Sequence, residues 1–257
     1  MTPHQSWIAF LALLRSEIRR FMRIWTQTLL PPVITMALYF VIFGTLVGSQ
    51  LKAIDGFTYM QYITPGLVMM SVVTSSYLNT VSSFYFLRFQ RSMDELVVSP
   101  MSNKIILAGF VLGGATRGIL VGALVMGVAL FFTHLDLSHA VLMCGTVLLA
   151  AMLFSLLGLL NGIFARNFDD ISIIPTFVLT PLTYLGGVFY SINMLSPFWQ
   201  KVSYLNPILY IVNALRYGLL GITDIPVYYG LGMMGVLVVA FFLINLTLLN
   251  KGVGIRT

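Results

Sequence analysis

Six stretches of this chain are long and apolar enough to cross a lipid bilayer, which a helix does with about 20 mostly apolar residues. They cover residues 28–47, 62–86, 105–132, 140–165, 171–190 and 228–249. Charged residues make up only 9% of the 257 residues, against about 25% in soluble domains. This combination excludes a soluble enzyme, a disordered linker, a coiled coil and a disulfide-stapled secreted domain. It predicts an all-α integral membrane protein, a single domain over residues 1–257 with six transmembrane helices.

A further apolar stretch, residues 191–225, is interrupted by Pro197 and by the pair Asn206 and Pro207. Proline removes a backbone donor and disfavours helix at the residue before it, so the pieces are too short to span. We expect a pair of short re-entrant helices before the last span, because irregular backbone within a membrane must be surrounded by protein or a water-filled cavity. Arg216 lies in the second piece.

Lysine and arginine are distributed unequally between the loops. With six crossings, ten of them lie on the side that holds both termini and three on the other, with Arg117 inside a span. By the positive-inside rule both termini are cytoplasmic and residues 191–225 are extracytoplasmic. The net charge of +6 therefore reflects membrane topology, and no nucleic-acid partner is expected.

Residues 4–26 have an amphipathic pattern. At about 100° per residue, Trp7, Leu11 and Trp25 share one apolar arc of a helix. The opposite side carries Arg15, Arg19, Arg20 and Arg23. This pattern predicts a helix in the cytoplasmic interface of the membrane, and the alternative is a solvated helix packed on another protein.

Several catalytic and binding motifs are absent from the sequence. No lysine follows a glycine, so there is no Walker loop for ATP. Neither His-Glu-x-x-His nor Gly-x-Ser-x-Gly occurs. His134, Asp136 and His139 cluster in one loop, but such a set is usually solvated, so no metal site is expected. We predict no catalytic residue and no cofactor in this chain.

Polar residues inside the predicted spans are the candidates for a transport pathway. The candidates are Ser71, Ser75, Asn79, Arg117, Thr176 and Thr180. The stripe on the second span either bonds to neighbouring helices or lines a water-accessible path. An arginine at mid-membrane costs about 2.5–3.5 kcal/mol, so Arg117 contacts substrate, pairs with another group, or lies nearer the cytoplasm. The ridge of Gly114, Gly118 and Gly122 favours close helix packing over a binding site. Hydroxyl groups beside Pro175 and Pro181 can satisfy the carbonyls that these prolines free.

The cytoplasmic loop 88–104 carries both signs of charge and a short helical stretch that Ser99 and Pro100 end. A loop that only connects two helices would be shorter and simpler. The alternative to a functional role is a solvated connector.

Three stretches resemble the permease subunit of type-2 ABC exporters. One is the loop sequence Asp-Glu-Leu-Val-Val-Ser-Pro-Met-Ser at residues 94–102, followed by a long apolar helix. Another is the broken segment with Asn-Pro-Ile-Leu-Tyr-Ile-Val-Asn-Ala-Leu-Arg at residues 206–216, the most specific of the three. The third is the amphipathic N-terminal helix. With the six spans, the resemblance covers nearly the whole chain.

The resemblance implies a permease in a bacterial inner membrane that forms a dimer, here expected to be a homodimer. It would bind two copies of a cytoplasmic ABC ATPase, and that partner would hold ATP and Mg²⁺. Loop 88–104 would be the coupling helix, with Arg88, Arg91, Asp94, Glu95, Leu96, Ser99 and Pro100 at the ATPase contact. The N-terminal helix would lie beside it, the second and fifth spans would line the route, and a re-entrant gate would contain Pro197, Asn206, Pro207 and Arg216. Substrates of the family include lipids, lipid-linked glycans and drugs.

Two other function classes compete with this interpretation. An ion-coupled secondary transporter usually places acidic or histidine side chains at mid-membrane, whereas every Asp and Glu here lies in a loop or terminal stretch. A membrane assembly factor without transport activity is the second alternative.

Overall fold

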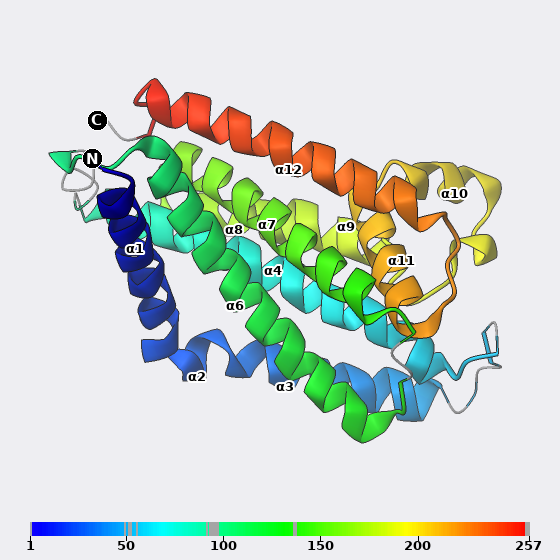
Figure 1. Ribbon diagram of the computed structural model, residues 1–257. Helices are drawn as coiled ribbons and strands as arrows, with labels where there is room; N and C mark the ends of the chain where they lie inside the picture. Colours follow the sequence, from blue (N-terminus) through cyan, green and yellow to red (C-terminus); the bar gives the residue numbers. More distant parts are fainter. Residues whose placement is uncertain are drawn as a thin grey trace.

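The computed structural model describes residues 2–48, 50, 53–54, 56–90, 92, 98–135 and 138–254. Over these residues the chain is helical, and the isolated pairing of Ile54 with Phe57 is the one extended contact. Figure 1 shows long helices running side by side in one bundle. In chain order the elements are α1 (Pro3–Arg23), α2 (Trp25–Thr28), α3 (Leu30–Tyr39), η1 (Phe40–Val47), α4 (Tyr59–Phe89), α6 (Asn103–Phe132), α7 (Ala140–Phe164), α8 (Phe168–Ile174), η2 (Pro175–Leu179), α9 (Thr180–Tyr184), η3 (Ile192–Met194), α10 (Pro197–Tyr204), α11 (Pro207–Leu220) and α12 (Val227–Asn250).

Four segments of the described chain combine the length and apolar composition of a membrane span. They are Trp25–Gly44, Asn103–Phe132, Ala140–Phe164 and Val227–Asn250. These segments coincide with the first, third, fourth and sixth predicted spans. The all-helical membrane architecture is therefore confirmed, and the count of six spans stays a prediction.

The two remaining predicted spans differ from these four. Helix α4 has 31 residues, long enough to cross, but its many hydroxyl-bearing side chains make it less apolar. The fifth predicted span is a chain of shorter helices that ends at Tyr184 instead of residue 190. Pro175 begins a stretch of π-helical turns because proline cannot donate to the helix ladder. The Thr180 hydroxyl donates to the Pro175 carbonyl oxygen at 2.9 Å, and the Thr180 amide donates to the same oxygen. This oxygen is not one of those that the prolines free, so the predicted role of the hydroxyls stays a prediction.

Helix α4 forms the centre of the bundle, between α6 and α7, and most of its length is buried. The predicted ridge of Gly114, Gly118 and Gly122 on α6 packs against α4. A Cβ placed on Gly118 would clash with Ser76 Oγ and lie 2.9 Å from the Val72 carbonyl oxygen. On the other side, a Cβ on Gly158 of α7 would lie 2.5 Å from the Tyr77 carbonyl oxygen. The interpretation of the ridge as a packing surface is therefore confirmed, since small residues let the backbones approach.

The two ends of the bundle carry different features (Figure 1). The starts of α1 and α6 and the ends of α4 and α12 lie at one end, and α1 runs from that end alongside the first half of α6. Helices α10 and α11 lie at the other end. The prediction that both termini share a side is consistent with this arrangement. Which side of the membrane that end faces stays a prediction.

Residues 191–225 do form two short helices, as their proline pairs predict. Pro197 and Pro207 occupy the first turns of α10 and α11, where a missing N–H costs nothing. Asn206 caps α11 by accepting from the Ile208 amide at 3.0 Å, and its own amide donates to the Leu182 carbonyl. Re-entry of this pair into the membrane stays a prediction.

Candidate functional site: a buried polar cluster between the N-terminal helix and the bundle

Helix α1 presents three faces instead of the two that its sequence predicts. An apolar arc containing Trp7, Leu11 and Met22 is exposed, as expected for a helix that contacts lipid. Exposed arginines lie beside it, namely Arg15, Arg19 and Arg23. The third face packs on α6, where Leu13 meets Gly109 and Glu17 meets Gly113. One face is thus left exposed, and another is covered by α6 of the same chain. Whether the exposed apolar face contacts lipid or another protein stays open as before.

Glu17 lies at the centre of that covered face. Its side chain is only 3% exposed. The Ser83 hydroxyl of α4 lies 2.7 Å from both carboxylate oxygens, and Arg20 Nη2 lies 3.2 Å from one of them. A buried carboxylate is tolerated only when it is paired and hydrogen-bonded, and both conditions hold here.

Arg20 extends the cluster to a second residue of α4. Its Nη2 donates to Asn79 Oδ1 at 3.0 Å and to the Asn79 carbonyl oxygen at 3.2 Å. The Arg20 side chain is 34% exposed, so it is partly buried against α4, whereas Arg15, Arg19 and Arg23 are exposed. The Arg20 guanidinium leaves their exposed face because the Glu17 carboxylate and the Asn79 carbonyl supply acceptors inside the bundle. Glu17, Arg20, Asn79 and Ser83 are called the α1–α4 cluster below.

Glu17 was absent from the residues that the sequence singled out. Its spacing to Arg20 is the local signal that could have found it, because residues three apart face each other on a helix. That spacing also occurs on many exposed helices. The partner that makes the pair a buried one, Ser83, lies 66 positions away in the chain.

The Arg117 side chain lies near the α1–α4 cluster, close enough for the charge of Arg20 to act on it. Its Nη2 donates to the Thr28 carbonyl oxygen at 3.0 Å. Thr28 belongs to the beginning of the first candidate span, Trp25–Gly44, so Arg117 lies level with one end of that span and not with its middle. Of the three interpretations of Arg117, pairing with another group fits this contact. Its depth in the membrane and a contact with substrate stay predictions.

The predicted ATPase contact is only partly within the described residues. Arg91, Asp94, Glu95 and Leu96 lie outside them. Arg88 donates to the carbonyls of Gly162, Ile163 and Ala165 at 3.0, 2.6 and 2.8 Å. These are the carbonyls that a helix leaves without partners at its C-terminus, so Arg88 caps α7 and fixes the start of the loop to it. At the far end of the loop, Ser99 is half-buried and Pro100 is exposed.

The predicted pathway residues do not share one surface of the chain. Ser71 and Ser75 are buried in the bundle, and Ser71 donates to the Val68 carbonyl. Thr176 and Thr180 are exposed on the proline-broken segment. Their assignment to a translocation route stays a prediction.

The predicted gate residue Arg216 is almost fully buried, with 1% of its surface exposed. Its Nη2 donates to the Gly187 carbonyl at 2.6 Å, and its guanidinium carbon lies 4.0 Å from the centre of the Tyr62 ring. Asp224 Oδ2 lies 3.9 Å from Nη1. Arg216 therefore connects α11 to α4 and to the turn after α9. Its assignment to a gate stays a prediction.

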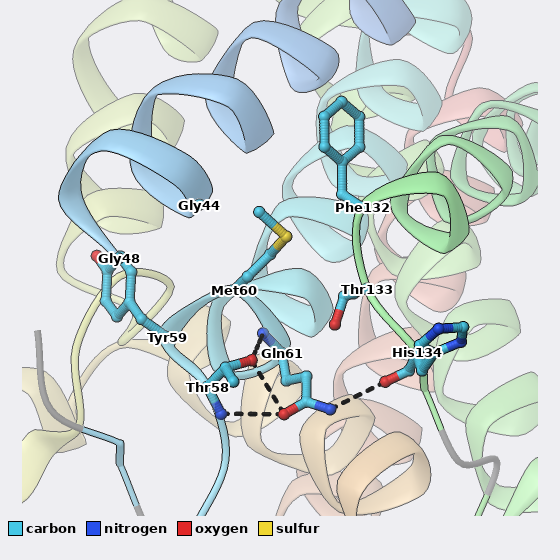
Figure 2. Close-up of a pocket in the computed structure, with 9 residues that line it drawn as sticks. All are labelled: Gly44, Gly48, Thr58, Tyr59, Met60, Gln61, Phe132, Thr133 and His134. Carbon is cyan, nitrogen blue, oxygen red and sulfur yellow. Dashed lines mark hydrogen bonds between the residues drawn. The ribbon is translucent and has the colours of Figure 1, made fainter.

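A pocket of about 460 Å³ lies between η1, the start of α4 and the end of α6 (Figure 2). Gln61 donates to the His134 carbonyl at 3.0 Å across its floor. The ring of His139 stacks on Tyr217 at 4.8 Å, away from this pocket. No group of metal-binding side chains occurs in the part of the chain that the structure describes, and Asp136 lies outside that part.

The model of the ABC-2 type transporter family matches residues 8–220. The chain belongs to the ABC-2 type transporter family. It is 54% identical to the inner membrane transport permease YadH of Escherichia coli K12 over 254 residues, which is 99% of both chains. It is also 23% identical to nodulation protein J of Neorhizobium galegae over 211 residues, 81% of this chain and 80% of that one.

These findings settle the broad class of the ABC-2 protein. It is a membrane transport subunit and not an enzyme, and its apolar helices and relatives indicate a multi-pass protein of a bacterial inner membrane. Membership of the family implies an ABC ATPase as partner.

Proposed function

We propose that this chain is the permease of an ATP-driven exporter that moves a lipid-like, glycan or drug-like substrate out of the cytoplasm. It would pair with a second copy of itself and with two copies of a separate ATPase, which would bind ATP and Mg²⁺. The termini and the loop 88–104 would face the cytoplasm. The observation that carries the proposal is the ABC-2 match over residues 8–220, together with full-length similarity to a transport permease.

The α1–α4 cluster supports a mechanical role for this end of the bundle. Helix α4 leads directly into the loop 88–104, and Arg88 anchors the start of that loop to the end of α7. Glu17 and Arg20 attach α1 to the same half of α4. In this mechanism, closure of the ATPase pair moves the loop, and α1, α4 and α7 respond together because charged hydrogen bonds join them. The ATPase supplies the differential binding energy between the inward-facing and outward-facing states.

Ion coupling fits the structure less well. Of the four acidic residues described, Glu17 is the one that is fully buried, and it is paired with Arg20 near one end of the bundle. A carboxylate that exchanges protons or sodium would be expected along a water path at mid-membrane. A scaffold without transport activity is the remaining alternative.

Copurification is the direct test of the partner. The tagged permease is expressed with the ABC ATPase encoded nearest to it, and the complex is isolated and weighed by native mass spectrometry. The proposal expects two permeases with two ATPases, and ATP-dependent uptake by inverted vesicles of at least one labelled lipid, lipid-linked glycan or dye. A permease that binds no ATPase, or a complex that hydrolyses ATP without moving any probe, contradicts it.

The coupling loop has its own test. Reversing both acidic residues, Asp94→Lys with Glu95→Lys, should leave the complex assembled but uncouple ATP hydrolysis from transport. Unchanged transport by this double variant would remove the loop from the mechanism. Loss of assembly alone would assign the two carboxylates to docking, which also contradicts the uncoupling role.

A further inference from the structure

A groove of about 490 Å³ runs between the start of α1 and the start of α6. Ile105, Ala108 and Leu112 line it from α6, at spacings that place them on one helix face. Trp7 and Phe10 line it from α1, with ring centres 5.4 Å apart. The groove is wide because Ala108, between two larger residues, fills little of it.

Lys104 is the charged residue of the groove. It is exposed at the rim, and no carboxylate among the described residues pairs with it. It also lies in the first turn of α6, where the helix dipole disfavours a cation and no acidic residue compensates. An apolar groove is complementary to a ligand that joins an anion to a hydrocarbon chain when the cation at its rim is paired with no described carboxylate.

The surroundings place this groove at the depth of lipid headgroups. Trp7 is 58% exposed and continues into the apolar arc of α1. Arg15 and Arg19 are exposed next to that arc. Aromatic and basic side chains in this arrangement lie at the boundary between headgroups and acyl chains. Basic residues at such a surface also attract anionic lipids.

We propose that this groove is a binding site for one anionic phospholipid, with its phosphate on Lys104 and the upper part of an acyl chain between Trp7 and Ala108. The site is separate from the α1–α4 cluster and does not depend on the proposed export function. It makes the position of α1 on α6 responsive to the anionic lipid content of the membrane, because the ligand contacts both helices.

Tryptophan quenching can test the site on the full chain. Trp25→Phe and Trp199→Phe leave Trp7 as the single tryptophan, since the chain has three. The purified permease is placed in nanodiscs of phosphatidylcholine that contain increasing mole fractions of bromo-acyl phosphatidylglycerol or bromo-acyl phosphatidylcholine. One lysine near an anionic surface contributes about fivefold in binding, so phosphatidylglycerol should reach half-maximal quenching at about a fivefold lower mole fraction.

Three variants distinguish lipid binding in the groove from a general effect of charge on lipid binding. Lys104→Glu should remove the fivefold preference, and it should not unfold the protein because a carboxylate suits the first turn of α6. Arg15→Glu changes the net charge equally at a position that does not line the groove. A general charge effect therefore appears in both variants, and the larger loss of preference in Lys104→Glu measures the contribution of the groove. Ala108→Phe fills the groove and should abolish the saturable component for phosphatidylglycerol. Equal quenching by both lipids in the parent protein, or equal losses in Lys104→Glu and Arg15→Glu, would overturn the proposal.

Discussion

Helices α4 and α7 approach each other so closely at Gly158 that a side chain does not fit between them. A Cβ placed there lies 2.5 Å from the Tyr77 carbonyl oxygen and 3.2 Å from the Tyr77 Cα and carbonyl carbon. All three atoms belong to the backbone, so no side-chain rotation can make room. Gly145 lies on the same helix and has no atom within 4 Å of such a Cβ. Gly158→Ala and Gly145→Ala are therefore a matched pair that adds one methyl group with and without a clash.

The expected cost follows from the separation that the methyl group needs. An ordinary van der Waals contact begins at 3.4 Å, so α4 and α7 must move apart by about 0.9 Å near Tyr77. A gap of about 0.5–1 Å forfeits a quarter to a half of each neighbouring contact energy, and overpacking typically costs ~1–3 kcal/mol. Alanine favours a helix over glycine by about 1 kcal/mol in both variants, so their difference isolates the packing cost. We expect Gly158→Ala to be less stable than Gly145→Ala by about 2 kcal/mol.

Thermal unfolding in detergent measures this difference. The fraction of protein that still elutes as a monodisperse peak is followed by size-exclusion chromatography after heating. For a chain of this size, about 2 kcal/mol corresponds to a separation of about 4–8 °C between the two midpoints. Midpoints that agree within error would refute the close backbone approach of α4 and α7.

Three further predictions concern buried charge and a helix cap. Glu17→Gln should destabilise the protein by about 1–3 kcal/mol, because it removes the negative charge that holds the α1–α4 cluster together. Its control, Arg15→Gln on the exposed face, should change stability by less than about 0.5 kcal/mol in the same thermal assay. Arg216→Gln should cost at least about 2 kcal/mol and increase hydrogen exchange in α11, since it removes a buried charged donor and its contact with an aromatic ring. The amides of Arg166 and Asn167 donate to Asp170 and hold the pKa of its carboxyl below the usual value. This stabilising effect is complete above the unfolded-state pKa and is lost as the pH falls through the lower folded-state pKa, so exchange in α8 should rise below about pH 4 and Asp170→Asn should remove that dependence.

Each of these predictions has a contrary outcome. Equal stability of Glu17→Gln and Arg15→Gln would mean that the α1–α4 cluster contributes nothing beyond a surface pair. Unchanged exchange in α11 for Arg216→Gln would show that packing alone holds the helix. An acid transition in α8 that persists in Asp170→Asn would assign it to another group.

Hydropathy and glycine spacing predicted much of the fold. The four segments that combine span length with apolar composition were all predicted from sequence, because the bilayer requires long apolar helices whatever their neighbours. The ridge of Gly114, Gly118 and Gly122 also indicated its role, since small residues at every fourth position leave a helix open to close approach. The proline pairs before α10 and α11 marked the first turns of those helices for an equally local reason.

The placement of charged side chains could not be predicted in the same way. The sequence placed Arg20 on the side of its helix opposite the apolar arc, left three interpretations open for Arg117, and placed Arg216 in a short extracytoplasmic helix without a partner. In the structure, the first contacts Asn79, the second donates to Thr28 and the third is buried.

The sequence by itself determined the class of this protein: a helical membrane subunit, the ends of several helices and the surfaces along which they pack. Tertiary structure alone decided which charges are buried and at what depth. The reason is that a buried charge is tolerated only with hydrogen-bonding partners, and these lie far away in the chain. Glu17 is 66 positions from Ser83, Arg117 is 89 from Thr28, and Arg216 is 29 from Gly187. Helical periodicity reports the direction of a side chain around its own helix, but not the tilt and offset of the neighbouring helix that supplies its partner.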